Sequence, residues 1–249
     1  MMDSTWLVTG AAALGAGALN AIAGGGSFLT FPALVFAGVP PLAANAPSAA
    51  AVSPGYLGSA LGFKQEIQQM PRHLLQREVL IAGIGGLIGA GFLLVTPAKL
   101  FSGLVPWLLL LLATALFALG PVIAARREGL GHPNWRLPGL MLVAIYGGYF
   151  NGGLGILLMA LYTLTGESRL NTVNALKNLN SFVLSWLSVA AFAWAGAIVW
   201  DQAVWMMALA TAGGWWGARL AKRLPARWVR GLVIATGLVM SAVFFSRLG

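Results

Sequence analysis

Long apolar segments run through most of this chain, and they constrain its fold more than any other feature. Six of the eight segments have the roughly 20 residues that a helix needs to cross a bilayer. These six are 43–63, 79–96, 100–123, 172–197, 203–219 and 229–246. The other two, 6–37 and 137–164, are longer and are interrupted by glycine-containing runs. The pattern predicts an all-α polytopic membrane protein.

The composition supports this prediction. Charged residues make up only 8% of the 249 residues and hydrophobic residues make up 59%, whereas a soluble domain carries about 25% charged residues. The chain therefore lacks the polar surface of a water-soluble globule. The absence of cysteine excludes disulfides and thiol chemistry. The net charge of +9 is expected to lie in cytoplasmic loops, so we expect a multi-pass protein of the bacterial inner membrane with no nucleic-acid partner.

The chain resembles itself when it is shifted by 128 positions. Gly24-Gly25 then falls on Gly152-Gly153, and Gly85-Gly86 falls on Gly213-Gly214. The alternative is chance similarity between apolar helices, but one offset aligns features along both halves. The shift predicts a duplication, with repeats at 1–124 and 125–249 forming one transmembrane domain, as is common in secondary transporters.

The basic residues predict how the halves are oriented. If all eight segments cross the membrane, fourteen of the fifteen basic residues, Lys177 being left out, divide seven to seven between the two sides. If 6–37 and 137–164 are hairpins that enter and leave on one side, twelve lie together and only Lys99 and Arg247 lie opposite. Lys and Arg collect in cytoplasmic loops, so the count favours hairpins. Each half then makes an odd number of crossings. The halves are inverted, both termini are outside, and the cytoplasmic loops are 64–78, 124–136 and 219–230.

The two glycine-containing breaks are candidate anion sites. Irregular backbone at membrane depth must be packed in protein or line a polar cavity, and these breaks open short predicted helices at 28–37 and 156–164. The first turn of a helix offers unpaired N–H groups and a positive dipole end. The alternative is that these glycines only permit close helix packing. The predicted binding residues of the breaks are Gly24, Gly25, Gly26, Ser27, Gly152, Gly153 and Gly155.

The segment after each hairpin supplies polar side chains. The first contains Asn45 and Ser48. The second contains Asn174, Lys177, Asn178 and Ser181, whose spacing of three and four places them on one helical face. Lys177 is the only charged residue well inside a predicted span, and such residues are functional candidates. The alternative is that its side chain extends to the cytoplasmic interface. A cation flanked by amide and hydroxyl groups is complementary to a small oxyanion.

No pattern points to catalysis. Paired carboxylates, a His-Glu motif and a Ser-His pair at useful spacing are all missing, and the glycine runs lack the Gly-Lys-Ser/Thr of a phosphate loop. We therefore expect no enzyme activity, catalytic residue, metal site or cofactor. Glu167 and Arg169 are expected to pair at the surface. Without a nucleotide site, energy would come from the substrate's own gradient or from a coupling proton or sodium ion.

The ordered motifs resemble the sulfite exporter TauE/SafE family of membrane permeases. The resemblance rests on Asn20-Ala-Ile-Ala-Gly24-Gly25-Gly26-Ser27 with Pro32, on Gly38-Val39-Pro40-Pro41-Leu42-Ala43-Ala44, and on the two Gly-Gly-x2-Gly-Ala runs. It covers nearly the whole chain, although the second glycine run is interrupted by Leu154. The resemblance implies transport of small sulfur-containing or carboxylate anions, such as sulfite, thiosulfate or sulfonates.

The sequence thus predicts a secondary transporter with inverted repeats that binds a small anion at the membrane midplane. Three alternatives stay open: an anion channel on the same scaffold, a carrier of small carboxylates, and a membrane assembly factor that transports nothing. Substrate, direction, coupling ion and oligomeric state are not specified by any motif in the sequence.

Overall fold

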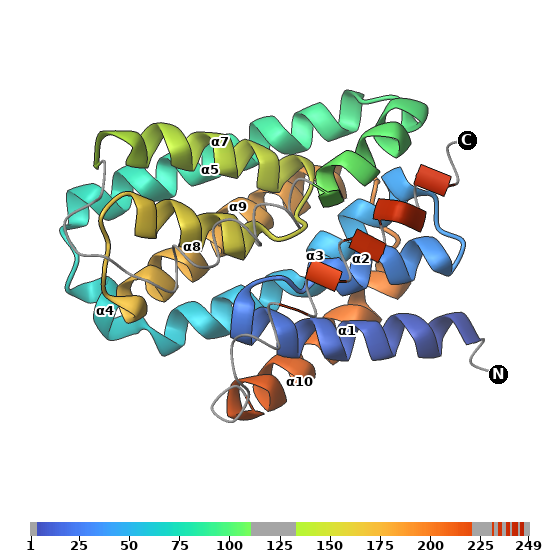
Figure 1. Cartoon of the computed structure of the whole chain (residues 1–249), viewed down its shortest axis with the longest axis horizontal. Coiled ribbons are helices and arrows are strands. Elements are labelled where there is room, and N and C mark those ends of the chain that lie inside the picture. The colour runs from blue at the N-terminus through green and yellow to red at the C-terminus, as the bar shows by residue number, and fades with distance from the viewer. Residues whose placement is uncertain are drawn as a thin grey trace.

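The computed structural model describes residues 4–110 and 133–220, together with 231, 234–235, 238–239, 241–243 and 245–246, and its regular structure is entirely helical over these residues (Figure 1). The helices are α1 (Ser4–Ala23), α2 (Ser27–Phe36), α3 (Pro41–Gly62), α4 (Lys64–Gln68), α5 (Arg72–Val95), Ala98–Leu110, the short 3-10 helix η1 (Pro133–Trp135), α7 (Arg136–Tyr149), α8 (Leu154–Leu164), α9 (Leu170–Trp194) and α10 (Trp200–Leu220).

The helices follow the apolar segments with one clear difference. The stretch 64–78 is not a loop, because it contains α4 and the first turns of α5. Backbone hydrogen bonding continues α5 beyond its apolar part, so this helix begins seven residues before the predicted position 79. Much of the predicted spans 100–123 and 229–246, and of the loops 124–136 and 219–230, lies outside the described residues.

In the sequence, six apolar segments are long enough to cross a bilayer. Fewer of the described helices are both long enough and apolar enough to do so. By length and composition, α5 is the one described helix that is both long and apolar enough to cross a membrane. Helices α2, Ala98–Leu110 and α8 are apolar but shorter. Helices α3 and α9 are long, but they carry many of the buried polar side chains of the described core. These polar residues lower the mean hydropathy of both helices. They face other helices rather than the outer surface.

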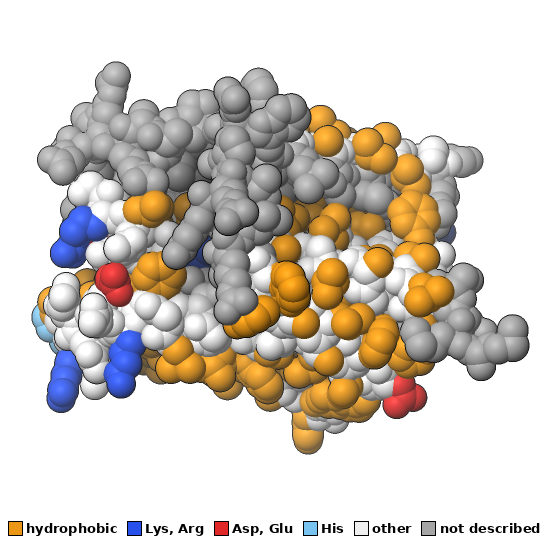
Figure 2. All heavy atoms as spheres, turned by 90° about the horizontal axis from the view of Figure 1, so that it is seen from below, with side chains coloured by type: hydrophobic (Ala, Val, Ile, Leu, Met, Phe, Trp, Pro, Cys, Tyr) orange, Lys and Arg blue, Asp and Glu red, His pale blue; other side chains and the backbone are white. Residues whose placement is uncertain are grey.

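The exposed surface is unusually apolar. Large hydrophobic side chains are exposed on each of the long helices, for example Leu14, Leu61, Phe92, Trp186 and Trp216. Figure 2 shows hydrophobic side chains spread over the visible face, with most of the visible Lys and Arg near the end that holds α4. An apolar surface of this kind suits contact with lipid.

Helix α4 lies at one end of the molecule, called here the α4 end, and the long helices run toward or away from it (Figure 1). Helix α3 runs toward this end and α5 runs away from it. Helix α9 also begins there, because Arg169 and Leu170 lie opposite Glu66 of α4 across a pocket. Helix α1 begins at the opposite end (Figure 1). Helices α3 and α9, which correspond under the 128-residue shift, therefore run in opposite directions.

Two close helix crossings join the halves of the chain. Helix α1 packs on α10, and α5 packs on α7. In the first crossing a Cβ at Gly17 would collide with the Ala210 carbonyl, and a Cβ at Gly213 would collide with that of Leu14. In the second, a Cβ at Gly89 would collide with the Ile145 carbonyl. Small residues allow such backbone approach between membrane helices.

The chain turns back on itself at each glycine-containing break. In the second half, a Cβ at Gly139, near the start of α7, would meet Leu161 near the end of α8. A Cβ at Gly147, near the end of α7, would meet Leu154 at the start of α8. Helices α7 and α8 are therefore antiparallel. In the first half, α2 packs on α1, and a Cβ at Gly26 would meet the Ala16 carbonyl.

Candidate functional site

The two breaks meet inside the molecule. Gly24 has φ +78° and Gly153 has φ +65°, which is the left-handed region that favours glycine. A Cβ at Gly24 would lie 2.8 Å from the Gly155 Cα, and a Cβ at Gly155 would lie 2.7 Å from the Gly24 Cα. The backbone of one half thus touches the backbone of the other close to the starts of α2 and α8.

One side chain, Asn151, links both breaks to the long helices. Its Oδ1 accepts hydrogen bonds from Ser27 Oγ at 3.2 Å and from the Tyr56 hydroxyl at 3.4 Å. Its Nδ2 donates to Ser185 Oγ at 3.0 Å. All these side chains are buried or nearly so. The network is neutral and joins the first break, α3, the second break and α9.

The polar residues of α3 also bind backbone near the breaks. Asn45 Nδ2 donates to the Tyr149 carbonyl at the end of α7, at 2.8 Å. Ser48 Oγ and Thr30 Oγ1 share a hydrogen bond of 2.6 Å, which ties α3 to α2. The Asn45 contact joins the two halves of the chain, whereas the Ser48 contact lies within the first half.

Helix α9 carries a buried polar stripe, which we define as Lys177, Ser181, Ser185 and Ser188. Their spacing of four, four and three keeps them on one face, and each is at most 2% exposed. Ser181 Oγ is buried and has no hydrogen-bond partner within the described part of the chain. Ser185 connects the stripe to the breaks through its hydrogen bond with Asn151. It lies eight residues beyond Lys177, or about 12 Å along the helix axis.

The structure therefore brings some predicted site residues together and separates others. Ser27 and the glycines at 24 and 155 meet at the breaks. Lys177 and Ser181 lie on α9 toward the α4 end, with Asn178 buried and Asn174 half-buried beside them. Lys177 is only 2% exposed, which argues against a side chain that extends to the interface. In this conformation Ser185, rather than Lys177, contacts the breaks.

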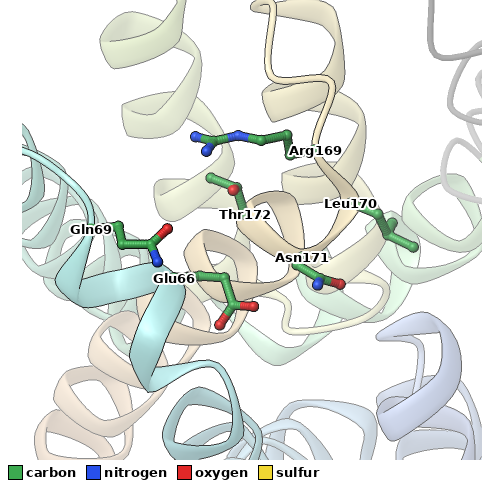
Figure 3. Close-up of a pocket in the computed structure, with 6 residues that line it drawn as sticks. All are labelled: Glu66, Gln69, Arg169, Leu170, Asn171 and Thr172. Atoms are coloured by element: carbon green, nitrogen blue, oxygen red, sulfur yellow. The ribbon is translucent and has the colours of Figure 1, made fainter.

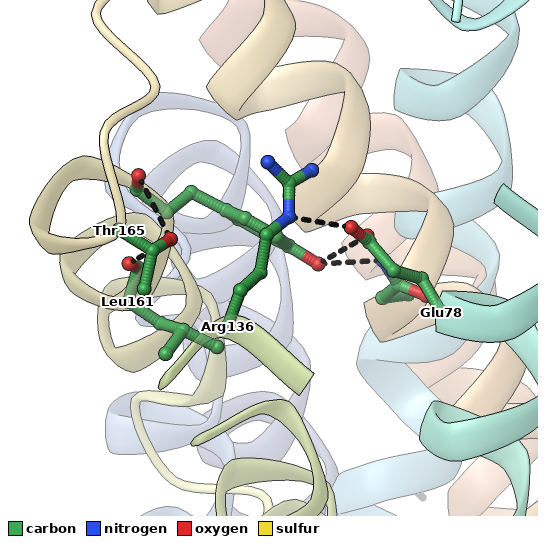
Figure 4. Close-up of polar contacts among 6 residues, drawn as sticks. Glu78, Arg136, Leu161 and Thr165 are labelled. Atoms are coloured by element: carbon green, nitrogen blue, oxygen red, sulfur yellow. Dashed lines mark hydrogen bonds and ion pairs between the residues drawn. The ribbon is translucent and has the colours of Figure 1, made fainter. Parts of the chain in front are cut away.

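A buried ion pair that was not predicted from the sequence lies near the α4 end. Glu78 of α5 is fully buried, and its carboxylate accepts a hydrogen bond from Arg136 Nε at 2.6 Å (Figure 4). It also accepts from the Tyr162 hydroxyl at 3.0 Å and from Asn180 Nδ2 at 3.1 Å. One carboxylate thus holds the start of α7, the end of α8 and the middle of α9. Lys177 is therefore not the only ionisable residue buried among these helices.

We expect Glu78→Gln to destabilise the protein strongly, because it leaves Arg136 without its counter-charge. Removing one partner of a buried pair costs about 3–5 kcal/mol, and with Arg136 16% exposed we expect a loss near the lower value. A chain of this size should then unfold about 6 to 12 °C lower, as measured by thermal unfolding in detergent. The double variant Glu78→Gln/Arg136→Gln should recover much of the loss.

The matched control is Glu167→Gln. Glu167 pairs with Arg169 at 3.3 Å, and the Arg169 side chain is 69% exposed, which confirms the expected surface pair. Exposed pairs contribute about 0–1 kcal/mol, so this change should shift the unfolding temperature little. A Glu78→Gln variant no less stable than the control would contradict the structural role of the pair.

A surface pocket of about 450 Å³ lies at the α4 end, between α4 and the start of α9. Figure 3 shows Glu66 and Gln69 on one side and Arg169, Leu170, Asn171 and Thr172 on the other. The pocket is open, and it lies less than two turns before Lys177 in the sequence of α9. It places polar groups of both signs at the outer end of the helix that carries the buried polar stripe.

Comparisons with known proteins agree with the resemblance seen in the sequence. The profile of a family described as sulfite exporter TauE/SafE matches residues 9–244. A probable membrane transporter protein of Haemophilus influenzae is 28% identical over 232 residues, which cover 90% of this chain and 88% of that protein. Probable membrane transporter proteins of Sinorhizobium (ORF9) and Escherichia coli K12 (YfcA) are each 25% identical, over 92% and 91% of this chain and 88% and 84% of theirs.

No solved structure matches the chain. The family match nevertheless spans all the described helices except the first turn or so of α1, and the relatives are similar to the chain over most of their own length. The chain therefore belongs to the sulfite exporter TauE/SafE family and is a multi-pass membrane transporter.

Proposed function

We propose that this transporter is a secondary carrier of small anions, most of all sulfur-containing ones such as sulfite, thiosulfate or organosulfonates. The observation that carries the proposal is the buried polar stripe of α9. Lys177 supplies an amino group that can pair with the anion as an ammonium, and Ser181 supplies a hydroxyl without a partner among the described residues. The choice of sulfur rests on the family description alone, and small carboxylates share the same binding chemistry.

The breaks form the second part of the proposed site. The starts of α2 and α8 offer main-chain N–H groups and positive dipole ends, and Gly24 and Gly155 keep those ends in contact. An anion that moved from Lys177 past Ser181 to Ser185 would arrive at Asn151 and Ser27, where the halves meet. Separation of the two breaks would then open the path, and their contact would close it. The proposed residues of this part are Gly24, Gly25, Gly26, Ser27, Asn45, Ser48, Gly152, Gly153 and Gly155.

We further propose that residues 1–124 and 125–249 are inverted repeats, each with a re-entrant hairpin. Three observations support this arrangement. The corresponding helices α3 and α9 run in opposite directions. The α1–α10 crossing has its counterpart in the α7–α5 crossing. The α7–α8 hairpin begins and ends near the α4 end, because Arg136 and Tyr162 both bind Glu78.

Single cysteines test this topology, because the chain has no native cysteine. His73→Cys, in the exposed first turn of α5, is expected to be cytoplasmic, and Ala98→Cys, after α5, is expected to be outside. In intact cells an impermeant maleimide should label position 98 but not position 73. Labelling at 73 and protection at 98 would mean that the proposed orientation is reversed. Labelling at both positions would contradict a crossing by α5.

The transport proposal is tested with purified protein in liposomes. A thermal-shift screen against sulfite, thiosulfate, sulfonates and dicarboxylates identifies the anions that bind. Counterflow then separates a carrier from a channel, since a carrier exchanges labelled anion against unlabelled anion whereas a channel only dissipates the gradient. Stabilisation by none of these anions, together with no exchange, would contradict the proposed function and favour a non-transporting membrane protein.

A further inference from the structure

Lys177 is a buried basic side chain for which the described residues provide no counter-charge. It is 2% exposed and makes no ion pair or side-chain hydrogen bond within the part of the chain that the structure describes. Four of the six acidic residues lie in that part. Glu78 is bound to Arg136 and Glu167 to Arg169. Glu66 lines the surface pocket, and Asp201 is exposed at the start of α10.

No described helix that packs against α9 places a carboxylate in an ion pair with Lys177. These helices are α3, α4, α5, α7, α8. Helix α5 contributes Glu78, whose charge is balanced by Arg136 of α7. Its first turns also carry Arg72, His73 and Arg77. The remaining titratable groups on these helices are Tyr56 of α3, Lys64 and Glu66 of α4, Tyr146 and Tyr149 of α7, and Tyr162 of α8.

An isolated charge inside a protein is unfavourable unless it is paired. Two events relieve the charge of a buried ammonium group: the proton leaves, or an anion arrives. Ser181 Oγ, one turn further along the same face, is a buried hydroxyl with no partner among the described residues, and it can donate to an anion oxygen. Lys177 and Ser181 therefore provide one proton-binding group and one donor at adjacent positions.

We propose that Lys177 binds a proton together with the anion, so that the carrier moves its substrate with one proton. This inference rests on the proposed function and specifies its coupling ion. In the empty site Lys177 is a neutral amine. In the loaded site the amine nitrogen has gained a proton, and the resulting ammonium group pairs with the anion. A site occupied by a monoanion then has the same net charge as the empty site, so neither form carries an uncompensated charge through the membrane.

Proton uptake on anion binding tests the proposal directly. Thiosulfate is the probe, because it stays a dianion near neutral pH and takes up no proton itself; its loaded site keeps one negative charge after one proton is bound, and every proton counted is bound by the protein. It is mixed with the detergent-purified full chain in a weakly buffered solution, and the protons absorbed are counted against the anion bound. Uptake by the wild type is measured at an alkaline and at an acidic pH; it should approach one proton per anion at the higher pH and fall at the lower one, where the empty amine binds a proton without the anion.

Two variants sharpen the test. Lys177→Arg should still bind thiosulfate, but without proton uptake at either pH, because a guanidinium group keeps its proton throughout this range. Lys64→Arg, at an exposed position on α4, is the matched control and should absorb protons like the wild type. If Lys177→Arg does not fold, a wild type that binds without uptake at the higher pH is enough to overturn the coupling.

The outcomes separate the two proposals. Binding without proton uptake by the wild type, or equal uptake by Lys177→Arg, would overturn the coupling and leave the anion carrier intact. Absence of binding by thiosulfate and by the other anions of the screen would overturn the proposed function and the coupling with it. Binding with uptake that is lost only in the arginine variant would support both.

Discussion

Lys177→Met is expected to weaken anion binding about 10- to 100-fold. A hydrogen bond to a charged group contributes about 1.5–3 kcal/mol, and each 1.4 kcal/mol is about a factor of ten in Kd. Methionine keeps most of the length and apolar bulk of lysine, so the packing around this buried position changes little. The measurement is the Kd of the anion by calorimetry, for wild type and variant at one pH.

The controls distinguish charge from shape. Lys177→Arg should recover binding only in part, because the guanidinium group is larger and forked whereas the ammonium is compact. Lys64→Met removes one positive charge from the exposed surface of α4 and should leave the Kd close to that of the wild type. Equal affinities for wild type, Lys177→Met and Lys177→Arg would remove Lys177 from the site and leave the breaks to hold the anion.

Gly24→Ala is expected to abolish transport while the protein still inserts into the membrane. The new Cβ would lie 2.8 Å from the Gly155 Cα, which is closer than real Cβ contacts, so the two breaks must move apart. Gly24 also has φ +78°, which costs an L-residue about 1–2 kcal/mol. Gly153→Val, at φ +65° in the other break, should have the same effect.

Gly38→Ala separates backbone strain from collision as the cause of lost transport. Gly38 has φ +90°, but a Cβ there would have no neighbour within 4 Å. This variant therefore carries the backbone strain without the collision, and it should lower the unfolding temperature slightly and keep transport. The assay is anion exchange in liposomes, normalised to the amount of inserted protein. Wild-type exchange by Gly24→Ala would show that contact between the breaks is not needed for transport.

The sequence predicted the breaks well because the signal for them is local. A glycine run inside an apolar segment marks the point where a membrane helix ends, and α1, α2, α7 and α8 end or begin within a few residues of Gly24 and Gly153. The polar face of α9 was also predictable, because a spacing of three and four places Asn174, Lys177, Asn178 and Ser181 on one side of any helix.

Other parts of the site depend on tertiary contacts that the sequence does not specify. Glu78 and Arg136 are 58 residues apart, and each lies at the edge of an apolar segment, where a charged residue ordinarily belongs to a loop. Asn151 had a local signal in the sequence, because it is a polar residue directly before the second glycine pair inside an apolar segment. That Ser185, not Lys177, reaches the breaks depends on how α9 is positioned relative to α7 and α8.

The crossing of α1 with α10 has a consequence for the order in which this chain is assembled. The Trp205 indole donates to the Trp6 carbonyl, two residues that are 199 positions apart. During synthesis, α1 therefore enters the bilayer long before its packing partner exists, and its glycine-lined face must stay in lipid or against insertion machinery until α10 follows. The α5–α7 crossing forms much earlier, because Gly89 and Ile145 are close in the order of translation. Assembly of the described helices should thus begin with α5 and α7 and finish with the packing of α10 on α1.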